Sequence, residues 1–480
     1  MSNHVVRVAL HTEKWQDDRL EKMFRCAQNV YNVALGKALD RMDAYHRLCD
    51  ARGPETEEEY LESQREAGFD KETMPVYSGG LACTDLRDEW YSDRLQKTLP
   101  SEAIKKVAGT AIQAVRDHAE GKLGRGRPKF KSSRYWSGDL HCIPGCLCYD
   151  LDIDESFFRI AGCRGGIDAM TIRTEEIEEG SRKYTQLSDT AANPSIDLIR
   201  KKIKGEVRYF AHVTCKGASV YAVDRFRRGT VGIDLGVSTI AAVGPDDAIL
   251  RPIIDREAVK EHAEKIADLQ RVLDRKRRKN NPECFDDQGR AVRGKYPTNT
   301  DRAQKIEDQI AEEHRRFSEE RKRQHYEIIN DLMAMGHIFK IEDQSYREWQ
   351  EGLFGVKSAK YAAGTLARRL RQKASGYGHQ VIEVDPYSTY LSSRCHCGKR
   401  SKKTLDKRMH VCKCGVEAQR DLYSANLLRY VNGDDLDVSQ VSRDWQSVEP
   451  RLREASRESE IRAASDMRGR TERSDDLLTA

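Results

Sequence analysis

Apolar residues recur along the N-terminal part of the chain with the spacing of one strand followed by helices. Val5–Leu10 is a short apolar strand, and residues 16–42 carry an amphipathic stripe that predicts a long helix. A second helix is predicted near 81–97, and a third follows with Ser101 as its candidate N-cap. Residues 50–80 are polar and rich in Gly, Glu and Pro, which indicates a loop or short helices.

Residues 139–228 change to short alternations of apolar and polar positions. This period is typical of strands with one buried face, so we expect a small antiparallel barrel or sandwich. Four cysteines fall in its first hairpins: Cys142, Cys146, Cys148 and Cys163. A second metal site is conceivable there. Because their spacing matches no standard ligand pattern, we interpret them as buried strand cysteines.

The helical period returns in two long, highly charged segments, 256–279 and 301–335. Each has an apolar stripe, and the segments are separated by a loop near 281–300, which predicts an antiparallel pair. A polar loop, a helix at 358–375 and a strand at Gln380–Val384 are expected after them.

Three acidic residues lie at the ends of predicted elements in this second half. Asp234 follows apolar residues in Gly232-Ile-Asp-Leu-Gly236, which predicts a strand, a tight turn and a second strand. Glu342 ends the apolar run that begins at Ile338, and Asp421 opens a predicted helix. Two carboxylates at strand ends and one at a helix start can converge on one site.

Converging carboxylates suit Mg²⁺, which takes hard oxygen ligands and keeps several waters. Two such ions, roughly 3.5–4 Å apart, can activate a water and stabilise the leaving oxygen of a phosphodiester. Asp234 taken alone is better explained as a turn residue. The ordered set of three favours a nuclease site with Asp234, Glu342 and Asp421 as the metal-binding catalytic residues.

A cysteine cluster precedes the third carboxylate. Cys395 and Cys397 form one pair and Cys412 and Cys414 another, each followed by a glycine, with a basic hairpin between them. Four thiolates suit one structural Zn²⁺ and leave no open position for catalysis. Within each pair, the two cysteines are separated by one residue rather than the usual two, so His396 is an alternative ligand.

Composition narrows the class of protein further. A chain of 480 residues requires several domains, and its charged fraction is 34%. The formal net charge is only +5, but Lys and Arg gather at 122–131, 275–279 and 399–408, so local basic surfaces can form. We find no membrane span or signal peptide and expect a cytoplasmic protein. The polar tail 431–480 is predicted to be mostly disordered or weakly helical.

With these pieces in order, the chain resembles the TnpB family and the compact type V CRISPR effectors. Gly232-Ile-Asp-Leu-Gly236 is similar to the first RuvC motif, Ile341-Glu-Asp343 to the second, and Arg420-Asp-Leu-Tyr-Ser-Ala-Asn426 to the third. Ala27-Gln-Asn-Val-Tyr-Asn32 and Arg127-Pro-Lys-Phe-Lys131 are similar to the family's recognition region. Each motif is weak alone, and the order of the set is the stronger signal.

The resemblance implies a multidomain α+β fold, with an RNase H-like RuvC α/β domain, a zinc ribbon, a β-barrel wedge and a helical recognition lobe. Its implied boundaries are 1–12 and 139–228 for the wedge, 13–138 for the recognition lobe, 229–392 and 416–430 for RuvC with the helical pair 256–335, and 393–415 for the ribbon that binds target nucleic acid.

The function implied by the resemblance is RNA-guided cleavage of double-stranded DNA next to a short flanking motif, with guide RNA and target DNA as partners. The chain would act as a monomer or homodimer. One alternative is an RNA-guided binder that silences without cutting, which loss of a carboxylate would signal. Another is a guide-independent, transposon-associated nuclease, for which the wedge and recognition regions are unnecessarily large.

A Gly-rich basic loop is the predicted contact for nucleic-acid phosphates. It contains Arg125, Arg127, Lys129 and Lys131, and Gly124 and Gly126 at its start permit close approach of the backbone. A solvated linker explains the same residues. Arg420, beside the third carboxylate, is a further candidate contact.

Overall fold

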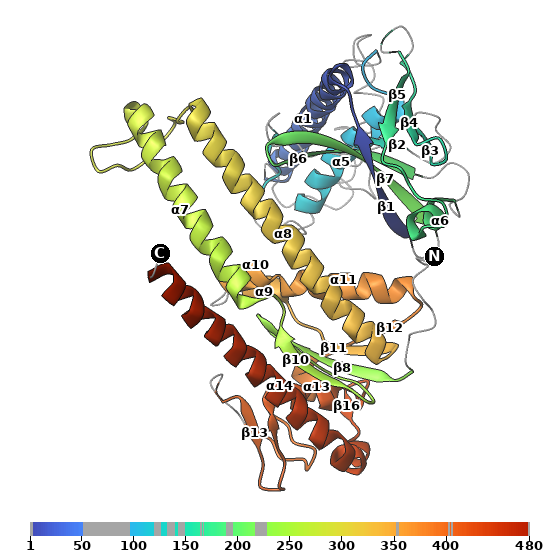
Figure 1. Ribbon diagram of the computed structural model, residues 1–480, viewed down its shortest axis with the longest axis vertical. Helices are drawn as coiled ribbons and strands as arrows, with labels where there is room; N and C mark the ends of the chain where they lie inside the picture. Colours follow the sequence, from blue (N-terminus) through green and yellow to red (C-terminus); the bar gives the residue numbers. More distant parts are fainter. Residues whose placement is uncertain are drawn as a thin grey trace. The chain divides into compact units, whose positions relative to one another are not determined.

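The computed structural model describes most of the chain and divides it into two compact units, residues 3–220 and 221–480 (Figure 1). The described residues are 3–50, 97–119, 126–131, 140–142, 149–163, 166, 168–188, 195–216, 228–351, 355–401, 404 and 407–478. Nearly all of the helix predicted near 81–97 lies outside them, as do Arg125, Cys146 and Cys148.

The first unit is built on one antiparallel sheet. Its strands are β1 (Asn3–His11), β2 (Leu140–Cys142), β3 (Tyr149–Asp152), β4 (Phe157–Ile160), β5 (Met170–Thr174), β6 (Ser195–Ile203) and β7 (Glu206–Lys216). They are ordered β2-β6-β7-β1-β5-β4-β3. The N-terminal strand therefore pairs with strands from 139–228, as expected. The end strands β2 and β3 do not pair, so the described residues form an open sheet and no closed barrel.

Helices α1 (Lys14–Asp50) and α5 (Ser101–Ala119) pack with this sheet into one core. The stripe predicted for 16–42 is buried, with Leu20, Phe24 and Leu35 at 0–2% exposure. The short helix α6 (Arg182–Ser188) joins β5 to β6. Cys215 is buried in β7, whereas Cys163 is only partly buried and follows β4 in a turn.

A five-stranded mixed sheet organises the second unit. Its strands are β8 (Thr230–Leu235), β9 (Thr239–Val243), β10 (Ala248–Pro252), β11 (Ile338–Glu342) and β12 (Gln380–Val384), in the order β10-β9-β8-β11-β12. The first three form antiparallel pairs, and β11 runs parallel to both β8 and β12. The predicted strand–turn–strand around Asp234 and the strands at 338 and 380 are confirmed.

Helices cover both faces of the sheet (Figure 1). On one face, helices α8 (Asp301–Met335) and α11 (Ala363–Gly376) pack over Val231, Ile233 and Phe339. On the other, helices α13 (Arg420–Leu428) and α14 (Val438–Leu478) pack over Ala241, Val243 and Val384. The alternation of side chains along β8 and β11 sends successive residues to these two separate cores.

Helix α13 (Arg420–Leu428) lies exceptionally close to β8. A Cβ atom added to Gly232 would stand 1.9 Å from the carbonyl oxygen of Ala425 and 3.0 Å from the nitrogen of Arg429. The glycine is therefore required because helix backbone occupies the place of a side chain. Every residue from Leu422 to Leu428 is buried, as expected for a helix enclosed on all sides.

The predicted antiparallel helical pair is confirmed as α7 (Arg256–Asn280) and α8 (Asp301–Met335), with the short 3₁₀ turn Pro282–Cys284 between them. Buried Asn281 closes the intervening loop, since its side chain accepts from the Thr298 nitrogen at 2.9 Å and donates to the Thr298 oxygen at 3.0 Å. Arg277 also pairs with Glu307 of α8.

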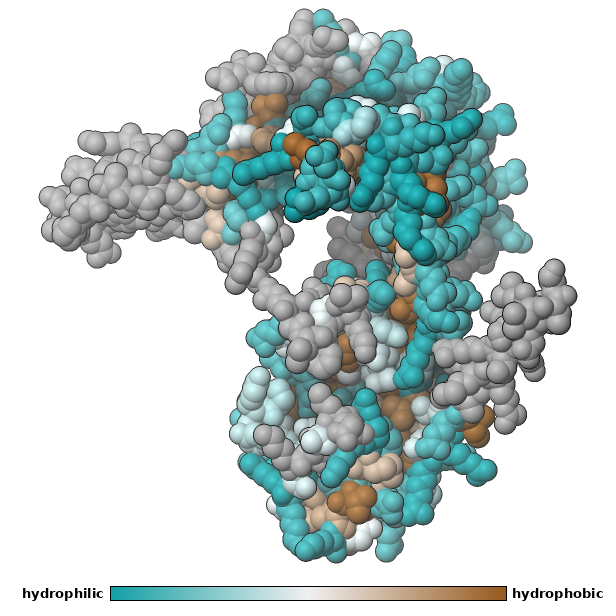
Figure 2. Space-filling model, turned by 90° about the vertical axis from the view of Figure 1, so that its left-hand side faces the viewer, coloured by the Kyte–Doolittle hydropathy of each residue, from teal (hydrophilic) through white to brown (hydrophobic). Residues whose placement is uncertain are grey.

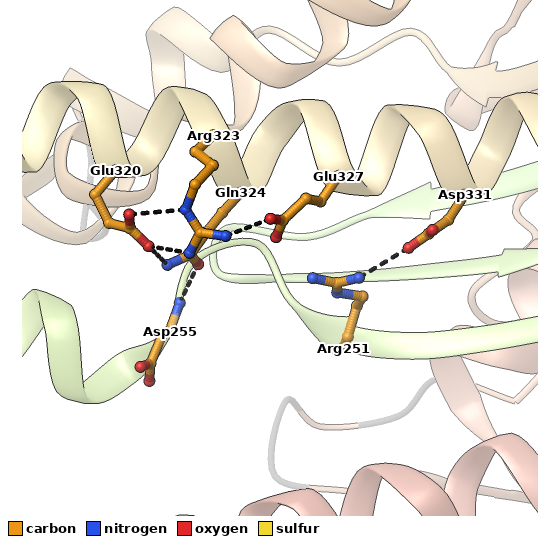
Figure 3. A network of polar contacts seen from close by, with 7 residues as sticks. All are labelled: Arg251, Asp255, Glu320, Arg323, Gln324, Glu327 and Asp331. Atoms are coloured by element: carbon orange, nitrogen blue, oxygen red, sulfur yellow. Dashed lines mark hydrogen bonds and ion pairs between the residues drawn. The ribbon is translucent and has the colours of Figure 1, made fainter.

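A polar network fixes the base of this pair (Figure 3). Gln324 of α8 accepts a hydrogen bond from the Asp255 nitrogen at 2.7 Å, and Asp255 caps α7 through the Glu257 nitrogen. Arg251 of β10 pairs with Asp331 of α8 at 2.9 Å. The network therefore joins the start of α7, the edge of the sheet and α8.

The helix predicted at 358–375 is two helices. After α9 (Tyr346–Glu351), α10 spans Gly355–Tyr361 and α11 spans Ala363–Gly376. Ala362 between them is left-handed, with φ 53°. One residue of that conformation interrupts the run of hydrogen bonds, so a continuous apolar stripe does not give a continuous helix.

The tail, predicted to be mostly disordered or weakly helical, contains regular structure. Strands β15 (Val431–Asn432) and β16 (Asp435–Leu436) form a small hairpin, and α14 extends over Val438–Leu478. Val441, Val448 and Leu452 of α14 are 0–1% exposed in the core beside α13. The helical alternative therefore describes this segment, because apolar residues spaced along one helical face suffice for packing even in a very polar segment.

The remaining elements are the short helix α12 (Pro386–Thr389) and the hairpin of β13 (Met409–Val411) and β14 (Glu417–Gln419). Figure 2 shows one face of the molecule, where hydrophilic residues predominate and apolar ones occur in small groups. Among the described residues, no helix is both long and apolar enough to cross a membrane.

We predict that Gly232→Ala lowers the free energy of unfolding by about 1–3 kcal/mol, because the new methyl group forces α13 away from β8. Thermal unfolding followed by circular dichroism measures this. Gly109→Ala is the control, since an added Cβ there meets nothing within 4 Å and lies on a helix. Equal melting temperatures for Gly232→Ala and the wild type would contradict the close packing.

Candidate active site

Two of the three carboxylates stand at the ends of neighbouring parallel strands. Ile341 of β11 is the register partner of Ile233 in β8, so Glu342 and Asp234 are the next residues along each strand. Because side chains alternate, both project to the face that carries Gly232. Their adjacency follows from the parallel pairing, which the sequence does not specify.

The third carboxylate comes from the helix that covers this face. Asp421 lies in the first turn of α13, where Gln419 is the N-cap and accepts a hydrogen bond from the Leu422 nitrogen at 2.7 Å. The contact of Ala425 with Gly232 holds the helix against β8. The structure thus brings Asp234, Glu342 and Asp421 together from separate elements.

The charges of Glu342 and Asp421 act on Asp234. Burial raises the pKa of Asp234 well above its usual range, the negative charges of Glu342 and Asp421 raise it further, and Arg420 opposes them. Burial also raises the pKa of Glu342, while a hydrogen bond from Gln344 lowers it. Crowded carboxylates that resist ionisation are characteristic of a site that receives a cation.

Neighbouring side chains orient two of the carboxylates. The Gln344 amide donates to Glu342 Oε2 at 2.8 Å, and its own Oε1 is buried without a hydrogen-bond partner. Arg420 Nε donates to Asp421 Oδ1 at 3.1 Å, and Arg408 lies 3.7 Å from Asp421 Oδ2. The sequence analysis missed Gln344, although a polar side chain two residues after Glu342 is close enough along the chain to contact that carboxylate.

The donor set fits Mg²⁺ in its chemistry, since it consists of carboxylate oxygens with an orphaned amide oxygen beside them. Among the described residues, the four cysteine sulfurs all lie within 4.8 Å of one another, whereas the carboxylate oxygens of Asp234, Glu342 and Asp421 do not form such a group.

The four predicted cysteines form a compact cluster. The sulfur atoms of Cys395, Cys397, Cys412 and Cys414 all lie within 4.8 Å of one another. Cys395 and Cys414 sulfurs are 3.6 Å apart, and those of Cys397 and Cys412 are 3.5 Å apart. The one-residue spacing within each pair is therefore compatible with a four-thiol site that could bind zinc.

Local backbone geometry explains how each pair turns. Gly398 and Gly415, which follow the two pairs, have φ of 85° and 97°, a conformation that favours glycine. The Cys412 thiol has its pKa lowered to about 7, mainly by a backbone hydrogen bond, whereas burial raises the pKa of Cys395 to about 12. Metal coordination would overcome the second effect by deprotonating the thiol.

His396 is engaged elsewhere and does not belong to the cluster. Its Nδ1 lies 2.9 Å from the hydroxyl of Tyr423, and its backbone nitrogen donates to the same hydroxyl at 3.0 Å. That hydroxyl also donates to the Cys395 sulfur at 3.5 Å. Tyr423 of α13 thus joins the cysteine cluster to the helix that carries Asp421.

The basic loop 126–131 is fastened to helix α1. The Lys131 carbonyl accepts from Gln28 at 2.7 Å and Asn32 at 2.8 Å, and Asn32 accepts from the Lys131 nitrogen at 2.8 Å. Arg127 pairs with Asp43 at 2.7 Å. The two motifs predicted for the recognition region, residues 27–32 and 127–131, are therefore in contact. The described part of the loop is bound to α1, unlike a solvated linker.

Arg420 is also held by the protein. Besides Asp421, its guanidinium reaches the carbonyls of Thr404 and Lys407, both at 3.4 Å, and its side chain is 14% exposed. Because these contacts engage the guanidinium of Arg420 within the protein, they favour a role in orienting Asp421 rather than the predicted role in binding nucleic acid.

Comparison with known proteins adds the family evidence. Residues 364–427, which include the cysteine cluster and Asp421, match the family described as Cas12f1-like, TNB domain. A search of curated proteins gives no match. These findings support the class predicted from the sequence, the TnpB and compact type V effectors.

Among solved structures, one similar chain is titled "Cryo-EM structure of the Cas12f1-sgRNA-target DNA complex". The match has a TM-score of 0.51 at 13% identity and covers 86% of this chain and 82% of that one. At this identity the comparison establishes the shared fold, a mixed α/β multidomain architecture.

We predict that the purified chain contains about one zinc ion and that Cys412→Ser lowers this content, because the variant lacks one of four clustered sulfurs. Elemental analysis measures the metal, and hydrogen exchange at 409–419 should rise in the variant. Cys284→Ser, at a buried cysteine outside the cluster, is the control. Unchanged zinc in Cys412→Ser would contradict the site.

We also predict that Asp234→Asn raises the melting temperature by a few degrees at neutral pH without divalent cations. The folded state raises the pKa of this acid, so its charge destabilises folding increasingly as pH rises above the ordinary value of 3.8. Mg²⁺ should then raise the melting temperature of the wild type more than that of the variant.

Differential scanning calorimetry across pH measures both effects. Asp287→Asn removes an exposed acid in the loop between α7 and α8 and should change neither quantity. A less stable Asp234→Asn protein would contradict the electrostatic reading of the site.

Proposed function

We propose that the chain is an RNA-guided DNA endonuclease whose second unit is a RuvC nuclease. The observation that carries the proposal is the convergence of Asp234, Glu342 and Asp421 from β8, β11 and α13. The sheet order β10-β9-β8-β11-β12, antiparallel and then parallel, is the arrangement expected of an RNase H-like domain.

The chemistry follows from what these residues can hold. Asp234, Glu342 and Asp421 would supply oxygen ligands to Mg²⁺, which when bound supplies the positive charge for phosphodiester hydrolysis. Gln344 keeps the Glu342 carboxylate oriented, and Arg420 does so for Asp421. Asp234 is half-buried at the end of β8, so its carboxylate could hold a cation that in turn would bind a phosphate oxygen.

The remaining parts support the guided mode of action. The solved relative is titled as a complex with sgRNA and target DNA, and the alignment covers 86% of this chain. We propose that guide RNA and target double-stranded DNA are the partners here. Residues 1–12 and 139–228 would form the wedge, 13–138 the recognition lobe, and 393–415 the zinc-containing ribbon that binds target nucleic acid.

The basic loop is the proposed phosphate contact of the recognition lobe. Its backbone is fixed on α1 through Lys131, and Lys129 projects from the same short segment. A basic loop of fixed shape is suited to binding the phosphates of a nucleic-acid backbone, and such contacts do not select a base sequence. Arg127 would contribute less, because Asp43 offsets its charge.

Asp234→Ala should abolish cleavage while leaving guided DNA binding within a few-fold of the wild type. Cleavage requires the carboxylate, whereas binding depends on base pairing and phosphate contacts. The RNA that copurifies with the full chain is sequenced and used as the guide in cleavage and filter-binding assays.

The matched control is Asp343→Ala, which removes the exposed acid next to Glu342 and should retain cleavage. Wild-type cleavage by Asp234→Ala would refute the assigned site. Guided binding without cleavage by the wild type would favour the silencing alternative, and cleavage independent of RNA would favour a guide-independent nuclease.

A further inference from the structure

Lys340 is a buried lysine in the middle of the apolar strand β11. It is 7% exposed, and its neighbours Phe339 and Ile341 are 0% and 2% exposed. Burial lowers the pKa of its ammonium group. A lysine in such a place is costly unless its donors are satisfied, so its partners indicate what it does.

Its partners all belong to the segment that ends helix α13. Lys340 Nζ donates to the carbonyl oxygens of Arg429, at 3.2 Å, and Val431, and lies 3.5 Å from Asn432 Oδ1. The last carbonyls of a helix have no partners within it, and that end of the helix attracts positive charge. Lys340 supplies both needs at Arg429, the C-cap residue of α13, and its second bond holds Val431 at the start of β15, directly after the helix.

The two ends of α13 therefore meet two residues of one strand. Lys340 and Glu342 are separated by one residue and share a face of β11, about 7 Å apart along the strand. Lys340 holds the last turn of α13, and Asp421 occupies its first turn. The distance of Asp421 from Glu342 consequently depends on where Lys340 fixes the helix along its axis.

The contact at Gly232 cannot fix this axial position alone. It limits how near α13 lies to β8, but van der Waals contact resists sliding weakly compared with directed hydrogen bonds. Arg429 adds one such bond, from Nε to the Thr230 carbonyl at 3.3 Å, at the same end of the helix.

We infer that Lys340 is a positioning residue for the acidic site: by binding the carbonyls at the end of α13, it sets the place of Asp421 relative to Asp234 and Glu342. The inference rests on the proposed function for its role in cleavage. The geometric part concerns only the assembly of the carboxylates and is testable without a guide RNA or DNA.

The test compares Lys340→Met, which keeps the length of the side chain and removes its donors, with Lys340→Gln, which retains an amide donor. Mn²⁺ alone is the probe, with binding to the zinc-loaded full chain measured by electron paramagnetic resonance. Binding that persists in Asp234→Ala is subtracted as unrelated to the site. The stability control is Phe339→Leu, the adjacent residue, whose side chain enters the opposite core.

Lys340→Met should weaken Mn²⁺ binding about tenfold, the lower end of what loss of a supporting contact does to a metal site. Lys340→Gln should retain part of the affinity and carries the test if Lys340→Met does not fold. With guide and target present, kcat should fall while DNA affinity is preserved.

Wild-type Mn²⁺ affinity in the Lys340 variants would overturn the inference. So would an equal loss of affinity in Phe339→Leu at the same reduction in melting temperature, because the role would then be structural only. If the Lys340 variants bound Mn²⁺ more weakly but the wild-type chain did not cleave DNA, the positioning role would be sustained and the proposed function refuted.

Discussion

The approach of α13 to β8 is the contact on which the second unit depends. A helix backbone can lie against a strand this closely only where the strand has no side chain, and Gly232 provides that place. The contact brings a residue near the end of the sequence to one that lies almost two hundred positions earlier. Without it, the sheet would hold two carboxylates and lack the third.

Helix α13 is also the part shared by the two candidate metal sites. Asp421 belongs to the acidic site, and Tyr423, two residues later, touches Cys395 and His396. His410 stacks on the Tyr423 ring, with centroids 4.3 Å apart. A displacement of the cysteine hairpin would therefore reach Asp421 through one turn of a helix that is buried on all sides.

The sequence was most informative where local chemistry determines structure. The turn after Asp234, the long helices 256–279 and 301–335, and the glycines after each cysteine pair depend on nearby residues and were predictable. The break at Ala362 and the ordering of residues 438–455 depend on contacts with distant elements. The parallel pairing of β8 with β11, which places Asp234 beside Glu342, also depends on tertiary structure.

Helix α14 has a consequence for how much of the chain the second unit requires. It packs beside α13 and along β10, which is an edge strand. A protein that stopped after the acidic residues, at position 430, would present Leu428 and the open edge of β10 to other molecules, and surfaces of that kind promote self-association. The shortest stable form of this unit therefore extends to Ala455, the last buried residue among those of α14 whose burial the structure describes, well beyond Asp421.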